Sequence, residues 1–300
     1  AFDAIGGEVV ATTATVFQNA HLEGKGAYVR LVDLIGSDPK RQAMLEAIQN
    51  PACGWFYRAD ASTFKDIPGT PIAYWASESM GRAFNEGHPL STYADLKMGL
   101  STGDNNRFYR FWWEIASPLI NFACNSVKDA RNGGKWFPCN RGGDFRKWFG
   151  NQWSVIDWEN DGYSIKNFFK SGRQASRPQN LDWSFKEGLS WNLITSGEPS
   201  MRMVAAGSMF DQAGCMCFPK KNVHWQILLA FANTSIVSQA LKIINPTLNC
   251  PPGVMSRLPV IPSDVFSKQV CQIVEEQVKH SKCDWDSFET SWDFKRHPLV

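Results

Sequence analysis

Short aromatic runs separated by turns rich in glycine and asparagine dominate the chain after Gly87. The pattern is densest in residues 99–114 and 135–151. Because the runs are short and the turns frequent, the pattern predicts an irregular β-rich domain with long loops. Glycine loops beside amide side chains, arginines and large aromatics also suit a surface that binds a polyanion and hydrogen-bonds to base edges.

The first 75 residues show a more regular pattern. Four segments predict strands from their content of strand-forming residues, and they are residues 8–17, 26–35, 54–59 and 72–75. Between them, Ser37 and Asp38 followed by Pro39 predict the start of a helix, which should end near Asn50 and Pro51.

Helices are predicted again in the second half of the chain. Residues 226–244 predict a helical region that residues 233–235 divide with a cap, and residues 106–124 are predicted to be partly helical. Ser263 and Asp264 then cap a helix whose apolar residues continue at helical spacing. This helix either packs on the core or acts as a spacer that docks a second domain or subunit. The class predicted is α+β.

The charge of the chain is concentrated rather than large. The net charge of the 300 residues is only +2, but residues 131–177 contain nine basic and four acidic residues. This excess of positive charge suits a surface that faces an anion. With 43% hydrophobic residues the chain can bury a large core and form two folded units. No apolar run approaches the length that spans a bilayer, so we expect no membrane contact.

The eight cysteines are scattered, without a paired framework, and we expect free thiols in a cytoplasmic protein. Cys215 and Cys217 with His224 nearby suggest a metal site, but the usual Cys-x-x-Cys spacing is absent. Buried thiols are the favoured interpretation, so we predict no metal.

The loop at residues 99–106 is one candidate contact with DNA. Gly103 allows a positive φ and a close backbone approach, and the polar residues after it offer hydrogen-bond donors and acceptors. A capped turn explains the same residues equally well. The candidates in this loop and just after it are Thr102, Asp104, Asn105, Asn106 and Arg107.

The stretch from Arg141 to Lys147 is the stronger candidate. Two adjacent glycines let backbone N–H groups approach an anion, and the basic side chains supply charge. The alternative is that Asp144 pairs with one arginine in a structural turn. Residues 163–180 contain no acid and predict a mobile loop that orders on DNA, or else a solvated loop. The basic candidates are Lys135, Arg141, Arg146, Lys147, Lys166, Lys170 and Arg173.

Several segments resemble the C-terminal half of the large adenine-specific DNA methyltransferases of BREX phage-defence systems, the PglX type. The segments that carry the resemblance are residues 1–10, 28–34, 67–75, 97–114, 135–151 and 155–165. Residues 231–261 resemble, more loosely, the closing segment of target-recognition domains in specificity subunits, through Ala232 to Ser235 and Leu258 to Pro262.

The resemblance implies a division of labour. In the family, an upstream domain binds S-adenosylmethionine and carries an Asn-Pro-Pro-Tyr-type loop that holds a flipped adenine. Here the nearest counterpart, residues 249–253, has its proline pair displaced and Gly253 in the aromatic position, so it is rejected as catalytic. The pair Gly6 and Gly7 is too short for a cofactor loop. We therefore expect no catalytic residue and no cofactor in this chain, with S-adenosylmethionine bound elsewhere in a longer parent enzyme.

The resemblance also implies three parts. They are a C-terminal remnant of the methyltransferase domain at 1–75, a β-rich target-recognition domain at 76–262, and a spacer helix and tail at 263–300. The implied partners are double-stranded DNA, the upstream methyltransferase domain and other subunits of the phage-defence system.

Three other functions fit the sequence less well. One is a DNA-binding or protein-interaction module of a restriction system without catalytic activity. A self-sufficient nuclease or hydrolase is disfavoured because no acidic cluster or nucleophile motif is present. A carbohydrate-binding module is suggested by the thirteen tryptophans, but it predicts a secreted, disulfide-bonded chain.

Overall fold

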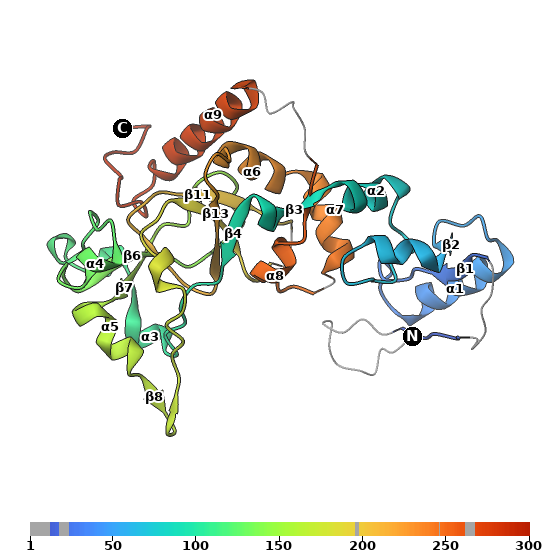
Figure 1. The fold of residues 1–300 in the computed structure, drawn as a ribbon, viewed down its shortest axis with the longest axis horizontal. Helices are drawn as coiled ribbons and strands as arrows, with labels where there is room; N and C mark the ends of the chain where they lie inside the picture. The colour runs from blue at the N-terminus through green and yellow to red at the C-terminus, as the bar shows by residue number, and fades with distance from the viewer. Residues whose placement is uncertain (1–12, 18–23, 196–197, 246, 262–267) are drawn as a thin grey trace. The chain divides into compact units, whose positions relative to one another are not determined.

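The computed structural model describes residues 13–17, 24–195, 198–245, 247–261 and 268–300. The chain forms two compact units, residues 1–85 and 86–300. The boundary between these units falls at Asn85, whereas the sequence placed a domain boundary after residue 75. Helices and several small sheets are mixed along the chain (Figure 1), and the predicted α+β class is confirmed.

The first unit is built around one pair of strands. Strand β1 (Gly26–Val29) pairs antiparallel with β2 (Phe56–Ala59), and α1 (Ser37–Gln49) connects them. The 3-10 helix η1 (Ala61–Asp66) and helix α2 (Glu78–Glu86) follow. Helix α1 occupies the predicted range because Pro51 disfavours continuation of a helix. Its N-cap is Gly36, which provides no side-chain hydrogen bond, rather than Ser37.

Of the strands predicted in this unit, one is shorter than predicted and another does not form. The strand predicted at 26–35 ends at Val29, and residues 72–75 form no strand. Residues 72–75 instead form irregular chain and a turn, in which the Tyr74 ring stacks on Tyr28 with 4.6 Å between centroids and Trp75 lies edge-on to Tyr74. Of the strand predicted at 8–17, residues 13–17 are irregular and the rest lies outside the described residues.

The second unit contains two four-stranded sheets. The first is antiparallel throughout, in the order β11 (Met201–Val204), β10 (Gly188–Asn192), β13 (Gly214–Pro219) and β4 (Ala94–Lys97). In the second sheet β12 pairs parallel with β6 and the other pairs are antiparallel. Its order is β12 (Met209–Phe210), β6 (Trp136–Asn140), β7 (Ser154–Asp157) and β5 (Tyr109–Phe111).

The aromatic runs that mark the sequence supply the core of this unit. Phe108, Phe137, Trp158 and Phe185 are at most 1% exposed and pack with Ile156 in one hydrophobic cluster. Each such side chain contributes about 1.5–3 kcal/mol when it leaves water. These buried aromatic residues are therefore structural, whereas others of the unit, among them Phe111, Trp113, Phe145 and Phe169, stay exposed.

The predicted division of residues 226–244 is confirmed. Helix α6 (Trp225–Ala232) ends before Asn233, and α7 (Ser235–Ile244) begins after Thr234, whose side chain accepts a hydrogen bond from the Val237 N–H. Among the described residues no single helix is long and apolar enough to cross a bilayer. Only α6 and α7 taken together pass that test, and they are bent by 69°.

Helix α9 (Lys268–Trp285) lies against α6 (Figure 1). Gln226 Nε2 donates to Glu275 Oε1 at 2.6 Å, and Val274 and Trp285 are buried. The described part of this helix therefore packs on its own unit, and docking of a second domain stays a prediction. The predicted caps Ser263 and Asp264 lie outside the described residues.

The remaining elements are short. The helical turns are α3 (Asn105–Phe108), η2 (Leu90–Thr92), η3 (Trp112–Glu114), η4 (Ser117–Leu119), α4 (Val127–Ala130), α5 (Glu159–Lys166), η5 (Leu181–Trp183) and α8 (Pro252–Met255). Two further strand pairs are β3 (His88–Pro89) with β14 (Pro259–Val260), and β8 (Phe169–Lys170) with β9 (Arg173–Gln174). Residues 106–124 are thus only partly helical, as predicted.

Candidate nucleic-acid interface

Two candidate segments that are far apart in sequence lie side by side in the second unit. Ser101 and Arg177 exchange two backbone hydrogen bonds, of 2.9 and 2.7 Å. The amide of Gln179 donates to the Gly99 carbonyl at 2.8 Å. On its other side the loop pairs through Leu100 with Asp211. The loop that begins at Gly99 is therefore fixed between two other segments, and its exposed end lies beside residues 166–177.

Two glycines make this close approach possible. A Cβ atom at Gly99 would overlap the Phe210 carbonyl. At Gly103, where φ is +76°, a Cβ atom would lie 2.6 Å from the Ala175 carbonyl oxygen. The positive φ and close approach expected at Gly103 are confirmed, but the partner is protein backbone.

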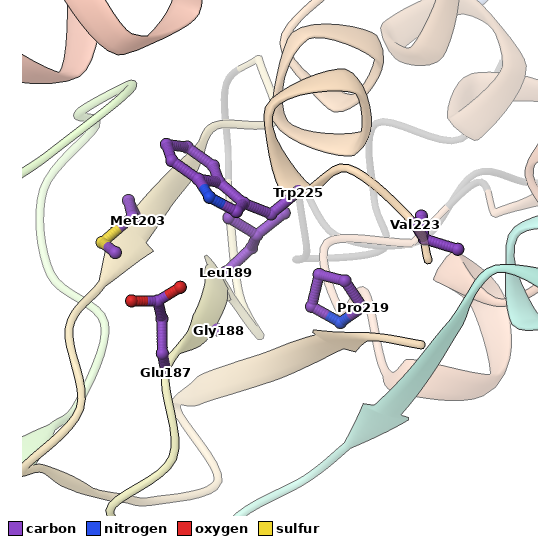
Figure 2. Close-up of a pocket in the computed structure, with 7 residues that line it drawn as sticks. All are labelled: Glu187, Gly188, Leu189, Met203, Pro219, Val223 and Trp225. Atoms are coloured by element: carbon purple, nitrogen blue, oxygen red, sulfur yellow. The ribbon is translucent and has the colours of Figure 1, made fainter. Parts of the chain in front are cut away.

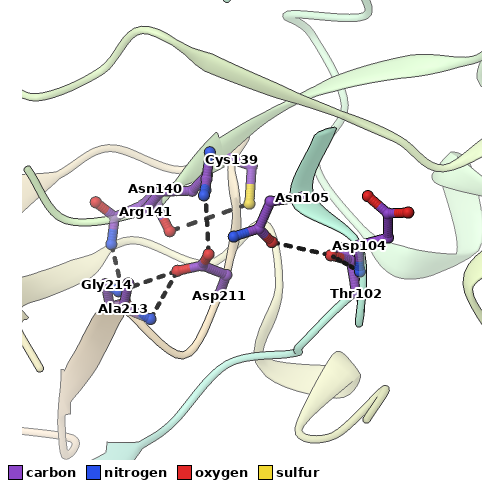
Figure 3. Close-up of polar contacts among 9 residues, drawn as sticks. All are labelled: Thr102, Asp104, Asn105, Cys139, Asn140, Arg141, Asp211, Ala213 and Gly214. Carbon is purple, nitrogen blue, oxygen red and sulfur yellow. Dashed lines mark hydrogen bonds and ion pairs between the residues drawn. The ribbon is translucent and has the colours of Figure 1, made fainter. Parts of the chain in front are cut away.

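The polar residues of this loop divide into two groups. Thr102 is buried, and its hydroxyl donates to Asn105 Oδ1 at 3.1 Å (Figure 3). Asp104 caps α3 by accepting a hydrogen bond from the Arg107 N–H at 3.1 Å. These two form the capped turn. Asn105, Asn106 and Arg107 are exposed, although Asn105 Oδ1 already accepts from Thr102 and the Arg107 guanidinium lies 5.0 and 5.2 Å from the ring centroids of Phe108 and Phe168.

Residues 169–174 form a hairpin rather than an irregular loop. Its two central residues, Ser171 and Gly172, both have positive φ, of 52° and 75°, as a type I′ turn requires. Strands β8 and β9 project from the second unit (Figure 1), and their four residues are exposed. In the register, Lys170 lies opposite Arg173 and Phe169 opposite Gln174.

The cations of the hairpin have no acidic partner in the described part of the chain. Neither Lys170 nor Arg173 takes part in an ion pair there, and the same holds for Arg107 and Arg177. Lys166, at the base of the hairpin, differs because its ammonium lies 2.9 Å from Asp161 Oδ2. Like charges directly opposite on paired strands repel each other, so Lys170 and Arg173 would gain from a bound anion.

Arg141 is used inside the protein. Its Nε lies 3.2 Å from Asp211 Oδ2 (Figure 3). Its guanidinium lies 3.9 Å from the Tyr109 ring centroid. Burial raises the pKa of Asp211, while Arg141 and the N–H groups of Gly214 and Ala213 act in the opposite direction. Asp144 is not the acidic partner that the structural alternative named.

The two glycines after Arg141 also serve packing. Both have positive φ, and a Cβ atom at Gly142 would lie 2.7 Å from the Ala213 carbonyl oxygen. The Gly143 carbonyl accepts a hydrogen bond from Asn192 Nδ2 at 2.5 Å. Asn192 in turn accepts from the guanidinium of Arg202 at 2.9 Å. The half-buried Asn192 and the buried Arg202 thus hold this loop in place.

Other basic candidates also have internal partners. Arg146 pairs with Asp284 at 3.1 Å and lies over the Trp285 ring. The Lys147 ammonium donates to the Asn233 carbonyl at 2.9 Å. Lys135 lies 3.3 Å from both Asp157 and Glu159. A phosphate would have to compete with these partners, so the roles of these residues in DNA binding stay predictions.

The structure adds residues that the sequence did not single out. Phe169, with 59% of its side chain exposed, stands on the hairpin, and Gln174 lies opposite it. The sequence does contain a pattern that indicates this hairpin: the turn-forming pair Ser171 and Gly172 lies between residues that can form strands. Arg202 is fully buried, which lowers its pKa to about 10. No sequence pattern marks it, because its burial depends on tertiary packing.

Outside the loop and the hairpin, three features of the described residues bear on a ligand pocket, a metal site or reactive thiols, and they are a small hollow, the possible metal ligands and the cysteines. A hollow of about 150 Å³ is lined by Leu189, Met203, Pro219, Val223 and Trp225, with Glu187 as its carboxylate (Figure 2). No group of three metal-ligating side chains occurs among the described residues. The predicted buried state of Cys215 and Cys217 is confirmed, and burial raises the pKa of each to about 12.

Comparison with known proteins relates the chain to adenine-specific methyltransferases. No family model matches it. Over its full length it is 38% identical to the adenine-specific methyltransferase PglX of Lacticaseibacillus casei (strain Zhang), covering 25% of that protein. It is 34% identical, again over its full length, to the adenine-specific methyltransferase BrxX of Escherichia coli O9:H4 (strain HS), covering 23%. The chain is homologous to these proteins and spans about a quarter of their length.

Proposed function

We propose that this chain is the DNA target-recognition part of an adenine-specific DNA methyltransferase in a phage-defence system. Full-length similarity to two adenine-specific methyltransferases supports the enzyme class. The exposed surface formed by residues 105–107 and the β8–β9 hairpin supports the role within that enzyme. We call these residues, together with Arg177, the hairpin surface.

The observation that carries the proposal is the free charge of the hairpin surface. Arg107, Lys170, Arg173 and Arg177 are exposed and form no ion pair within the described residues. Beside them, Asn106 offers a donor and an acceptor, and Asn105, whose Oδ1 accepts from Thr102, offers its amide N–H groups. Unpaired cations bind phosphates and release counterions, while amides suit base edges. The surface therefore has the two kinds of group that sequence-specific DNA binding uses.

Methyl transfer is assigned to the rest of the parent enzyme. S-adenosylmethionine would supply the methyl group there. The hollow near Trp225 does not fit that cofactor, because it has a single carboxylate and no glycine loop. At residues 249–253, the Cys250 N–H donates to the Leu193 carbonyl and Pro252 begins α8, so this segment is structural. The role of this chain is to position duplex DNA for a catalytic domain that flips the adenine.

The test is binding of duplex DNA measured by fluorescence anisotropy as salt is varied. We expect wild-type binding to weaken steeply with salt, and the double variant Lys170→Ala with Arg173→Ala to bind weakly with a shallower salt dependence. Lys279→Ala, an exposed lysine on α9, is the matched control and should bind as the wild type does. Absence of wild-type binding, or binding that ignores salt, would contradict the proposal.

A further inference from the structure

Phe169 is the exposed aromatic side chain of the hairpin, and its neighbour shows why. Phe168 points into the unit, where its ring packs edge-on against Phe108 at 5.3 Å. Successive residues of a strand point to opposite faces, so Phe169 points away from that core and 59% of its side chain is exposed. In the described residues no aromatic ring stacks on it.

The residue opposite Phe169 completes a small polar and apolar face. Phe169 and Gln174 are directly paired in the register, so their side chains share one face of the hairpin. Gln174 Nε2 donates to the Lys166 carbonyl at 3.0 Å, which fixes the amide and leaves Oε1 as an acceptor. Lys170 and Arg173 share the opposite face. One face therefore presents a ring and an acceptor, and the other presents two cations.

We propose that the face formed by Phe169 and Gln174 contacts an A·T pair in the major groove of the bound DNA. The ring packs on the thymine methyl group, and Gln174 Oε1 accepts a hydrogen bond from the adenine amino group. This inference rests on the proposed function. Lys170 and Arg173, on the other face, contact phosphates and add affinity without sequence preference.

The groups that base pairs display in the major groove explain why an A·T pair is proposed. The major groove admits a two-stranded β-ribbon, and the thymine methyl is the apolar group that it displays. The amino group of adenine is a donor in the same base pair. A G·C pair also displays a donor, from cytosine, but it has no methyl group for the ring. A face with one ring and one acceptor thus matches an A·T pair.

The test replaces thymine by uracil, which lacks only the methyl group. Wild-type protein first selects its preferred duplexes from a random pool, and these duplexes are then made with uracil at each thymine in turn. At the position read by Phe169 we expect wild-type affinity to fall about fourfold, the value of one buried methyl group. Phe169→Ala should bind the thymine and uracil duplexes equally, with an unchanged salt dependence.

Two variants keep the result interpretable. Phe169→Leu keeps an apolar side chain and should retain part of the preference for thymine. Phe288→Ala removes another half-exposed phenylalanine, which lies outside the hairpin, and should retain all of it. Circular dichroism and thermal unfolding of each variant establish that it folds.

Several outcomes would overturn the inference. One is wild-type binding that does not distinguish thymine from uracil at any position. Another is a thymine preference that survives in Phe169→Ala. If Phe169→Ala weakens binding while uracil has no effect, the ring acts as a wedge between bases and the methyl contact is wrong. Each of these leaves the proposed function intact, whereas failure of the wild type to bind duplex DNA overturns both.

Discussion

At the scale of single residues, the glycines of the two aromatic blocks are required by packing within the protein. Gly99 and Gly103 bring one loop against the backbone of two other segments, and Gly142 does the same near Ala213. Positive φ at Gly103 and Gly142 adds a backbone requirement that other residues meet only at a cost. The ligand-binding consequence is indirect: the glycines hold the exposed residues of the hairpin surface in place.

Replacement of Gly103 should therefore destabilise the protein. For Gly103→Ala we expect a loss of about 2 kcal/mol in the free energy of unfolding, because of the positive φ and the contact with Ala175. Gly253→Ala is the matched control: a Cβ atom there meets nothing within 4 Å and the residue lies within α8, so the change should leave stability the same or raise it by up to about 1 kcal/mol. Urea denaturation measures both. Equal changes in the free energy of unfolding of the two variants would show that the close approach at Gly103 does not matter for stability.

The buried thiols predict a pH dependence. Burial raises the pKa of Cys215, Cys217 and Cys250 from 9.0 to about 12, so the folded protein favours their neutral form. Their contribution to stability is thus fully present below about pH 9 and is lost as the pH rises toward 12. At pH 8 iodoacetamide should label the exposed Cys283 and leave these three unlabelled until urea is added. Mass spectrometry of the peptides measures this, and comparable labelling of Cys215 and Cys283 would contradict it.

At the scale of elements, the hairpin of β8 and β9 carries a conflict between stability and binding. The register places two cations directly opposite each other at its tip, with no acid paired to either in the described chain. A structural hairpin gains nothing from this arrangement. The arrangement is understandable if the hairpin faces a polyanion, which removes the repulsion on binding.

The conflict can be tested with one charge reversal. Lys170→Glu places opposite charges across the strands and should raise stability by up to about 0.5 kcal/mol. The same change should weaken DNA binding about tenfold or more at moderate salt, because a phosphate contact is replaced by repulsion. Urea denaturation and anisotropy measure the two effects, with Lys279→Glu on α9 as the control. A variant that is less stable, or that binds DNA normally, would refute the argument.

At the scale of the whole molecule, folding divides the basic residues into two classes. Of the nine between residues 131 and 177, Arg131, Lys135, Arg141, Arg146 and Lys166 have acidic partners. Lys147 donates to a backbone carbonyl. Of these nine, only Lys170, Arg173 and Arg177 have neither an acidic partner nor a side-chain hydrogen bond among the described residues, and Arg107 beside them forms no ion pair there either. The basic excess of the sequence thus overstates the charge available to a ligand.

This division predicts how DNA binding depends on salt. If the four unpaired arginine and lysine residues each contact one phosphate, the slope of log Kobs against log salt concentration should lie between about −3 and −4. Contacts from all nine basic residues of the cluster would instead give about −8. Anisotropy titrations from low to moderate salt measure the slope. A value near −8 would show that the internal ion pairs open on DNA.

The sequence by itself determined the mixed class, the range of α1, the division between α6 and α7 and the resemblance that the comparisons support in part. These follow from local chemistry, since caps, proline and periodicity act over a few residues. The sequence could not separate Arg141 from Arg173, because both are arginines beside glycine in a basic stretch.

Only the tertiary structure decided which candidates face solvent. Asp211 and Asp284 neutralise Arg141 and Arg146 from 70 and 138 residues away, and no local pattern encodes such pairs. Backbone pairing of Ser101 with Arg177 likewise joins the loop to the hairpin across a long stretch of chain. The interface is therefore a property of long-range contacts: the sequence supplies its residue types, and packing selects the members that remain free.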